Sequence, residues 1–234
     1  MSPHRDSRAD ATLQEARAWD DLLKTTGDDS RLTGLYLAFI VLACFIAAAG
    51  LVSGSAVTIV GAMVVSPDFG PLAAMAVGAV IGDGARVRRA ATALLVGFGL
   101  AMAVTAAVGL VLRAGGWWDP HLEQSLRAGE LAFVYQVGPL SWAVAALSGV
   151  AGILALSSEK SGTLVGVFIS VTTIPAAACC ALAVVAGSGD LALSALLQLL
   201  ANLTGVFLAA VGTVWVRREE LELRRHTIGA SAAG

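Results

Sequence analysis

One carboxylate stands in a long stretch of sequence that is otherwise uncharged. Between Leu32 and Ile81 the only formal charge is Asp68, in the run Ser66–Pro71. A carboxylate within a membrane costs free energy and usually marks a functional site. An ionised Asp68 facing a cavity would favour protons or cations. If Asp68 instead accepts hydrogen bonds from free backbone N–H groups at the start of a helix, it is a helix cap. Other helix N-termini at the same depth in the membrane would then be free to bind anions. The sequence leaves both interpretations open.

The prolines on either side of Asp68 predict an interrupted helix. Pro67 and Pro71 lack a backbone N–H and push the preceding residue out of helical geometry. Two half-helices, about 55–66 and 71–81, would cross the membrane together and place the break near its middle. Irregular backbone at that depth is tolerated only inside protein or beside a water-filled cavity. The candidate site for a substrate or ion therefore includes Ser66, Pro67, Asp68, Gly70 and Pro71.

Further polar residues could converge on the same site. Thr172 and Thr173 precede Pro175, and Gln198 and Asn202 lie four residues apart, so they share one face of a helix. Each of these side chains could instead form a hydrogen bond between helices. No metal and no cofactor is expected, because the histidines and cysteines show no clustered ligand spacing.

The composition indicates which structures must position these residues. Of 234 residues, 57% are hydrophobic and 14% are charged, and the mean hydropathy is +0.79. Soluble chains are about 25% charged, and long uncharged segments are typical of membrane spans. The net charge of -2 offers no basic surface for nucleic acid. Soluble globular proteins, disordered chains and nucleic-acid binders are therefore excluded.

Six apolar segments predict six transmembrane helices, over about 34–52, 55–81, 90–112, 131–156, 162–186 and 191–216. An even number of spans puts both termini on one side, and the loop charges predict the cytoplasmic side. Of the 15 basic residues, 13 then lie inside, and only Arg113 and Arg127 lie outside. We expect a multi-pass protein of the plasma membrane, with cytoplasmic tails over 1–33 and 217–234 and a membrane domain over 34–216.

The segments outside the spans leave two questions open. The tail from Ala11 to Thr25 carries an apolar helical stripe, which predicts an amphipathic helix. This helix could lie on the membrane surface or pack on its own protein. In the external connection 113–130, Trp117 and Trp118 are typical of interfacial anchors, and a lid over a substrate is the alternative.

The second and fifth predicted spans resemble each other. Both contain small residues, hydroxyl groups and proline, and both are followed by a Gly-Asp turn. Repeats over about 34–112 and 131–216 would each hold three helices, so they would have inverted topology with interrupted second and fifth helices. This plan is common in transporters, whose sites lie where the helices break. The alternative is that glycine and proline are frequent in membrane helices in general.

Three motifs carry a resemblance to a known family. They are GAMVVSPDFGPLAA at 61–74, LVGVFISVTTIPAA at 164–177 and NLTG at 202–205. With these motifs, residues 35–216 resemble an uncharacterised hydrophobic membrane family of bacteria, domain of unknown function 389. The resemblance implies several membrane spans in a bacterial inner membrane, and it implies almost no chemistry.

The sequence favours a transporter or channel for a small solute or ion, with its site at the helix breaks. A membrane scaffold or accessory subunit is the alternative. The sequence argues against an enzyme, because it has no H-E-x-x-H, no nucleophile-elbow motif and no paired intramembrane carboxylates. The expected partners are the lipid bilayer, the small solute or ion, and further copies of the chain in a homo-oligomer through small-residue faces.

Overall fold

The helices follow the apolar segments of the sequence. The computed structural model describes residues 19–29, 31–119, 122–127, 134, 136–156 and 173–232, with side chains up to residue 219. Residues 19–29 are helical, and no strand occurs in the described ranges. The further helices are α2 (Gly34–Val52), α3 (Ala56–Val65), α4 (Phe69–Ile81), α5 (Gly84–Ala114), α6 (Leu122–Arg127), α7 (Pro139–Leu156), α9 (Thr173–Ala186) and α10 (Gly189–Ala232).

Polar caps set the starts of three helices within this apolar sequence. The hydroxyls of Thr33 and Ser55 accept from backbone N–H groups of α2 and α3 at 3.1 and 3.2 Å. The Asp83 carboxylate accepts from the N–H of Arg86 at 3.0 Å at the start of α5. These bonds satisfy N–H groups that have no partner within the helix. Gly82 ends α4 with a φ of 77°, which favours glycine.

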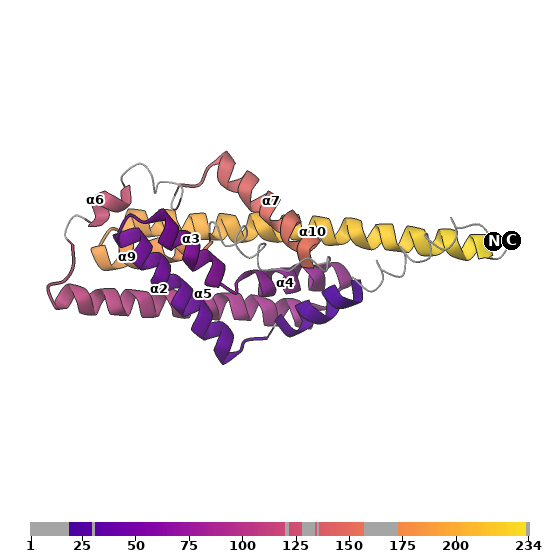
Figure 1. The fold of residues 1–234 in the computed structure, drawn as a ribbon, viewed down its shortest axis with the longest axis horizontal. Helices are drawn as coiled ribbons and strands as arrows, with labels where there is room; N and C mark the ends of the chain where they lie inside the picture. The colour runs from indigo at the N-terminus through magenta and orange to yellow at the C-terminus, as the bar shows by residue number, and fades with distance from the viewer. Residues whose placement is uncertain are drawn as a thin grey trace.

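The two shorter helices α4 and α9 occupy the centre of the bundle. Each of them contacts both of the long helices α5 and α10. In Figure 1, α9 and α4 follow one another along the long axis of the molecule. Helices α2 and α3 form a hairpin on one side, and α7 packs on α10. Two half-length helices thus lie between two long ones.

The apolar helices confirm a multi-pass membrane protein. Four described helices are long and apolar enough to cross a membrane: α2, α5, α7 and α10, and the bent pair α3–α4 adds a fifth if it is one span. The predicted fifth span is described only from Thr173 onward, as the 14 residues of α9. Six spans and an inverted repeat are therefore not confirmed. Helix α7 begins at Pro139, later than the predicted 131, because proline favours the first helical position.

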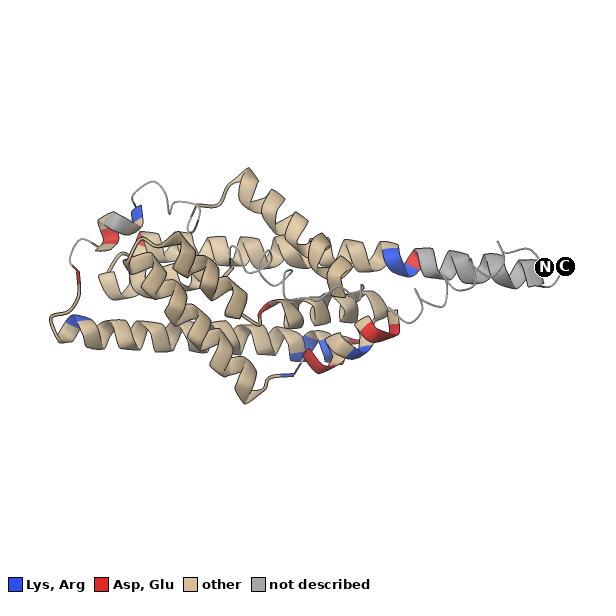
Figure 2. Cartoon of the chain, in the orientation of Figure 1, with Lys and Arg blue, Asp and Glu red and all other residues tan. Residues whose placement is uncertain are grey.

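Most charged residues lie toward the two ends of the described bundle, and the helices between them are largely uncharged apart from the start of α4 (Figure 2). At one end Arg86 contacts the segment 19–29, and Arg218 donates to the carbonyl of Val80 at 2.8 Å. At the other end lie Arg113 and Arg127. This distribution fits the grouping of basic residues that the loop charges predict.

The described part of the N-terminal tail packs on its own protein. The side chains of Leu22 and Thr26 are 1% and 0% exposed. Arg86 on α5 donates from Nη1 to the carbonyl of Leu23 at 3.2 Å and to Oγ1 of Thr26 at 3.3 Å. Residues 19–29 therefore pack on the protein, which is one of the two predicted arrangements of this amphipathic stretch. The earlier part of the stripe lies outside the described residues.

Candidate functional site

The predicted interruption is present and separates α3 from α4. Helix α3 ends at Val65, α4 begins at Phe69, and the two axes are bent by 51°. Ser66 takes the extended conformation (φ -71°, ψ 130°) that a residue before proline prefers. Pro71 lies in the first turn of α4, where a helix does not need the missing N–H.

The Asp68 carboxylate is buried at this break and bound by two hydroxyl groups. Its side chain is 1% exposed. Ser66 Oγ donates to Asp68 Oδ1 at 2.9 Å, and Thr173 Oγ1 donates to Asp68 Oδ2 at 2.5 Å. Thr173 is fully buried and is the first residue of α9. The first residues of α4 and α9 therefore meet at one carboxylate.

The capping interpretation of Asp68 does not describe these bonds. Asp68 occupies the N-cap position of α4, but its side chain forms no capping hydrogen bond there. The hydroxyl donors come from the break and from α9 instead. The carboxylate also lies at the N-terminal, positive end of α4, which favours a negative charge there. A functional role of Asp68 stays a prediction.

Tyr36 on α2 is a further polar residue near the break, and sequence reasoning missed it. The side chain is 8% exposed, and its hydroxyl has no hydrogen-bond partner among the described residues. It packs on Gly97 of α5, where an added Cβ would lie 2.6 Å from the hydroxyl oxygen. The hydroxyl is close enough to Asp68 for the two groups to interact electrostatically. A lone tyrosine within an apolar span was the available signal.

The tail reaches the break from the other side of α4. A Cβ added to Gly70 would lie 2.9 Å from Oδ2 of Asp29, so that carboxylate sits directly against the first turn of α4. Partial burial, and then the neighbouring charge of Asp28, raises the pKa of Asp29. The absence of a side chain at Gly70 permits this contact.

The polar pair on α10 is buried, and Gln198 links two helices. Gln198 and Asn202 are both 0% exposed. Gln198 donates from Nε2 to Oγ of Ser141 on α7 at 3.0 Å. This bond matches the interpretation of Gln198 as a link between helices. The structure thus brings Ser66, Asp68 and Thr173 together, and Thr172 lies outside the described residues.

A family profile, described as Domain of unknown function (DUF389), matches residues 63–208. The chain belongs to this family. The match begins within α3 and ends within α10, so it includes the break and Thr173 and leaves out Tyr36 and the tail segment. No curated protein and no solved structure matches the chain.

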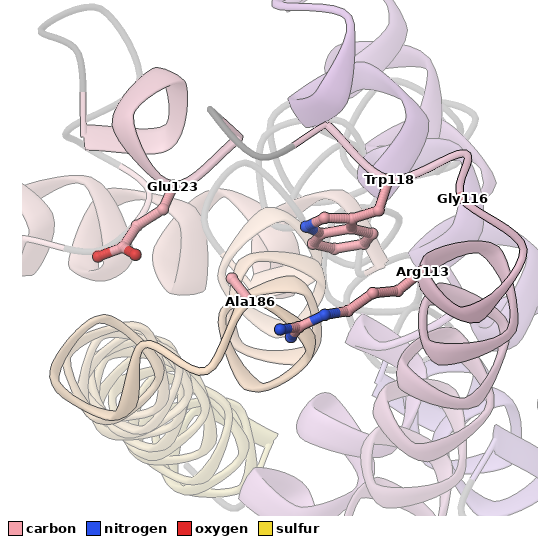
Figure 3. Close-up of a pocket in the computed structure, with 5 residues that line it drawn as sticks. All are labelled: Arg113, Gly116, Trp118, Glu123 and Ala186. Atoms are coloured by element: carbon pink, nitrogen blue, oxygen red, sulfur yellow. The ribbon is translucent and has the colours of Figure 1, made fainter.

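Within the family region, a hollow lies at the end of the molecule that is remote from the tail segment. It has a volume of about 370 Å³ and is lined by Arg113, Gly116, Trp118, Glu123 and Ala186 (Figure 3). Arg113 donates from Nη1 to the carbonyl of Val185 near the end of α9. Trp118 lines this hollow, whereas Trp117 is 81% exposed.

An ion-pair network joins α6 to the start of α10 beside this hollow. Arg127 contacts Asp190 at 2.6 Å and Glu123 at 3.0 Å. The Ser188 hydroxyl lies 2.9 Å from Asp190 and 2.8 Å from Glu123, so it can donate its single hydrogen to either carboxylate. The hydrogen bond from Arg127, together with that from Ser188, lowers the pKa of Asp190 to about 2. These contacts hold α6 against the α9–α10 turn.

Proposed function

We propose that the protein is a transporter or channel for a small solute or ion, with its site at the break between α3 and α4. The observation that carries this proposal is the carboxylate of Asp68, which is 1% exposed and bound between the starts of α4 and α9. Irregular backbone and a carboxylate inside a membrane protein are typical of substrate and ion pathways. Interrupted helices whose break forms the binding site are typical of transporters. No enzymatic role is proposed.

The proposal includes the plasma membrane as the location, with both termini in the cytoplasm. The grouping of the described basic residues supports it: Arg86 and Arg218 lie at the end where the tail segment packs, and Arg113 and Arg127 lie at the other. Cytoplasmic loops carry an excess of Lys and Arg.

The proposal also includes a homo-oligomer. Gly61 on α3 has no other atoms within 4 Å of an added Cβ, so it leaves open space on the surface of a helix. Small residues of this kind let the backbones of membrane helices approach closely. Crosslinking in mild detergent tests this part of the proposal.

Purified protein in liposomes provides the central test. We would measure swelling in gradients of urea, glycine, potassium chloride and potassium acetate, for wild type, Asp68→Asn and Asp119→Asn. Asp119 is the matched control, because it is exposed in the external connection. At least one solute should enter faster than it enters empty liposomes. Because the hydrogen bonds of Asp68 are charge-assisted, Asp68→Asn should change the entry rate of that solute by about ten-fold or more.

Labelling with a thiol reagent that does not cross membranes tests the site independently of any solute. The background has Cys44, Cys179 and Cys180 replaced by alanine. Ser66→Cys should react from at least one side of the membrane, whereas Ala62→Cys, at a position of α3 that is 0% exposed, should not. Unreactive Ser66→Cys together with no solute entry would refute a transport site at the break.

A further inference from the structure

We infer that the ion bound at the break is a proton, and that binding it to Asp68 releases the contact between α4 and α9. The inference rests on the proposed function and names the ion that this site takes. The contact consists of the Asp68 carboxylate and the hydroxyls of Ser66 and Thr173, and we call it the α4–α9 joint.

The hydrogen bonds of the joint fit an ionised carboxylate. Both oxygens of Asp68 accept, one from each hydroxyl. A protonated carboxyl group gains an O–H donor and loses its negative charge. The bonds from Ser66 and Thr173 then lose their charge assistance, which accounts for roughly half of their strength. Protonation therefore weakens the side-chain link between the start of α4 and Thr173 of α9.

The ligands at the joint fit a proton better than a metal cation. Hard cations take about six or more oxygen ligands at once. The joint offers one carboxylate and two hydroxyls, and both hydroxyls direct their hydrogens at the carboxylate. No group of three or more His, Cys, Asp or Glu residues that could hold a metal lies within the part of the chain that is described.

Tyr36 supplies a second observation at the same place. A buried hydroxyl without a partner costs free energy unless another conformation satisfies it. Tyr36 as a residue is 8% exposed, and its hydroxyl is buried, lacks a partner in the described structure, and interacts electrostatically with Asp68. We assign the Tyr36 hydroxyl as the group that forms a hydrogen bond with whichever group of the joint loses its partner when the joint opens.

Other titratable and charged groups surround the joint, and the experiment must separate them from Asp68. Asp29 lies against Gly70, and it titrates above its ordinary range because its pKa is raised. The arginines bind farther along the helices: Arg86 at Leu23, Arg113 at Val185 and Arg218 at Val80. The remaining groups are the thiols of Cys44 on α2 and of Cys179 and Cys180 on α9, and the uncharged Gln198 and Asn202 on α10.

Infrared difference spectra of the reconstituted protein, recorded while the pH is changed, test the inference without a known solute. Wild type should show a C=O band of a buried carboxylic acid that Asp68→Asn abolishes and Asp29→Asn retains. Thr173→Val should raise the ratio of protonated to ionised Asp68 at a fixed pH by about ten-fold or more, because one charge-assisted bond is lost. Thr105→Val, which removes another buried hydroxyl on α5, should leave that ratio unchanged.

Hydrogen exchange at one fixed pH tests the release of the joint. Asp68→Asn imitates the protonated side chain, so the first turns of α4 and α9 should exchange faster than in wild type. Equal exchange in both proteins would overturn the opening step.

Repeating the infrared titration in sodium, potassium and choline salts should give the same curve. A curve that shifts with sodium would overturn the proton assignment in favour of sodium, and the absence of an Asp68-dependent band would overturn it altogether. The two proposals fail separately. Solute entry without the band refutes the proton inference alone, whereas the band without any solute entry refutes the transport function alone.

Discussion

Replacing Gly149 of α7 with alanine should push α7 away from α10 and destabilise the protein. An added Cβ would lie 2.5 Å from the carbonyl oxygen of Val206, 2.8 Å from the Cβ of Ala209 and 3.1 Å from the N of Ala210. None of these atoms can rotate away, because all belong to the backbone or the first side-chain carbon of α10. Since packed atoms stay about 3.5 Å apart, the helices must separate by roughly 1 Å. Such overpacking costs about 1–3 kcal/mol.

Gly99→Ala on α5 is the matched control, because an added Cβ there meets nothing within 4 Å. Both variants gain helix propensity, so the difference between their melting temperatures isolates the clash. The thiols of Cys44 and Cys179 are 0% and 1% exposed, so a thiol-reactive dye reports unfolding in detergent. At about 2–4 °C per kcal/mol, Gly149→Ala should melt roughly 2–12 °C below Gly99→Ala. Equal melting temperatures would show that α7 and α10 are not packed this closely.

Three further variants test the regions around the site. Tyr36→Phe removes a buried hydroxyl that has no partner among the described residues, so the melting temperature should stay the same or rise. Solute entry into liposomes should slow. Slowed entry with normal melting would show that the hydroxyl serves function and not stability. Arg86→Gln removes the hydrogen bonds to Leu23 and Thr26, which are worth about 1 kcal/mol each. Trypsin should therefore cut several-fold faster after Lys24. An unchanged rate would mean that this arginine does not hold the segment 19–29. In wild type, the lowered pKa of Asp190 means that its ion pair stabilises the protein fully above the ordinary pKa of 3.8, and this stabilisation is lost as the pH falls toward about 2. Pepsin should therefore cut at the buried Leu122 and Leu126 only near pH 2. In Arg127→Gln, which lacks the ion pair, pepsin should already cut there at pH 4.

Local sequence chemistry predicts the spans and the break well. The uncharged segment 34–52 coincides with α2, because Thr33 and the apolar run define a helix start and length without help from the rest of the fold. The prolines at 67 and 71 predict the interruption for the same reason, since a missing N–H acts locally. The observed half-helices differ from the predicted ones mainly in the start of α4, at Phe69 instead of 71.

The sequence could not determine which residues far apart in the chain contact each other. The hydroxyl that binds Asp68 comes from Thr173, 105 positions along the chain, and several other hydroxyls in the apolar segments were equally plausible partners. The contact of Asp29 with Gly70 and the approach of Gly149 to α10 depend on how helices pack, which spacing alone does not determine. The sequence offers Gln198 either as part of the site or as a link between helices, and its partner, Ser141 of α7, follows only from how the helices pack.

A carboxylate is a poor choice for a purely structural joint, and a combined leucine variant, Asp68→Leu with Ser66→Ala and Thr173→Val, tests this. Burying an ionised group costs free energy that its partners rarely exceed, and replacing such a group together with its partners by apolar residues of similar volume is often neutral or stabilising by about 1–4 kcal/mol. If Asp68 only fastens α4 to α9, the leucine variant should melt at or above the wild-type temperature and transport normally. The proposed role predicts a stable protein that has lost solute entry and the pH-dependent infrared band. Ser148→Ala, which alters another buried polar residue on α7, is the control and should keep both signals. A leucine variant that retains both would leave the charge without a function, so this variant separates a working carboxylate from a structural one.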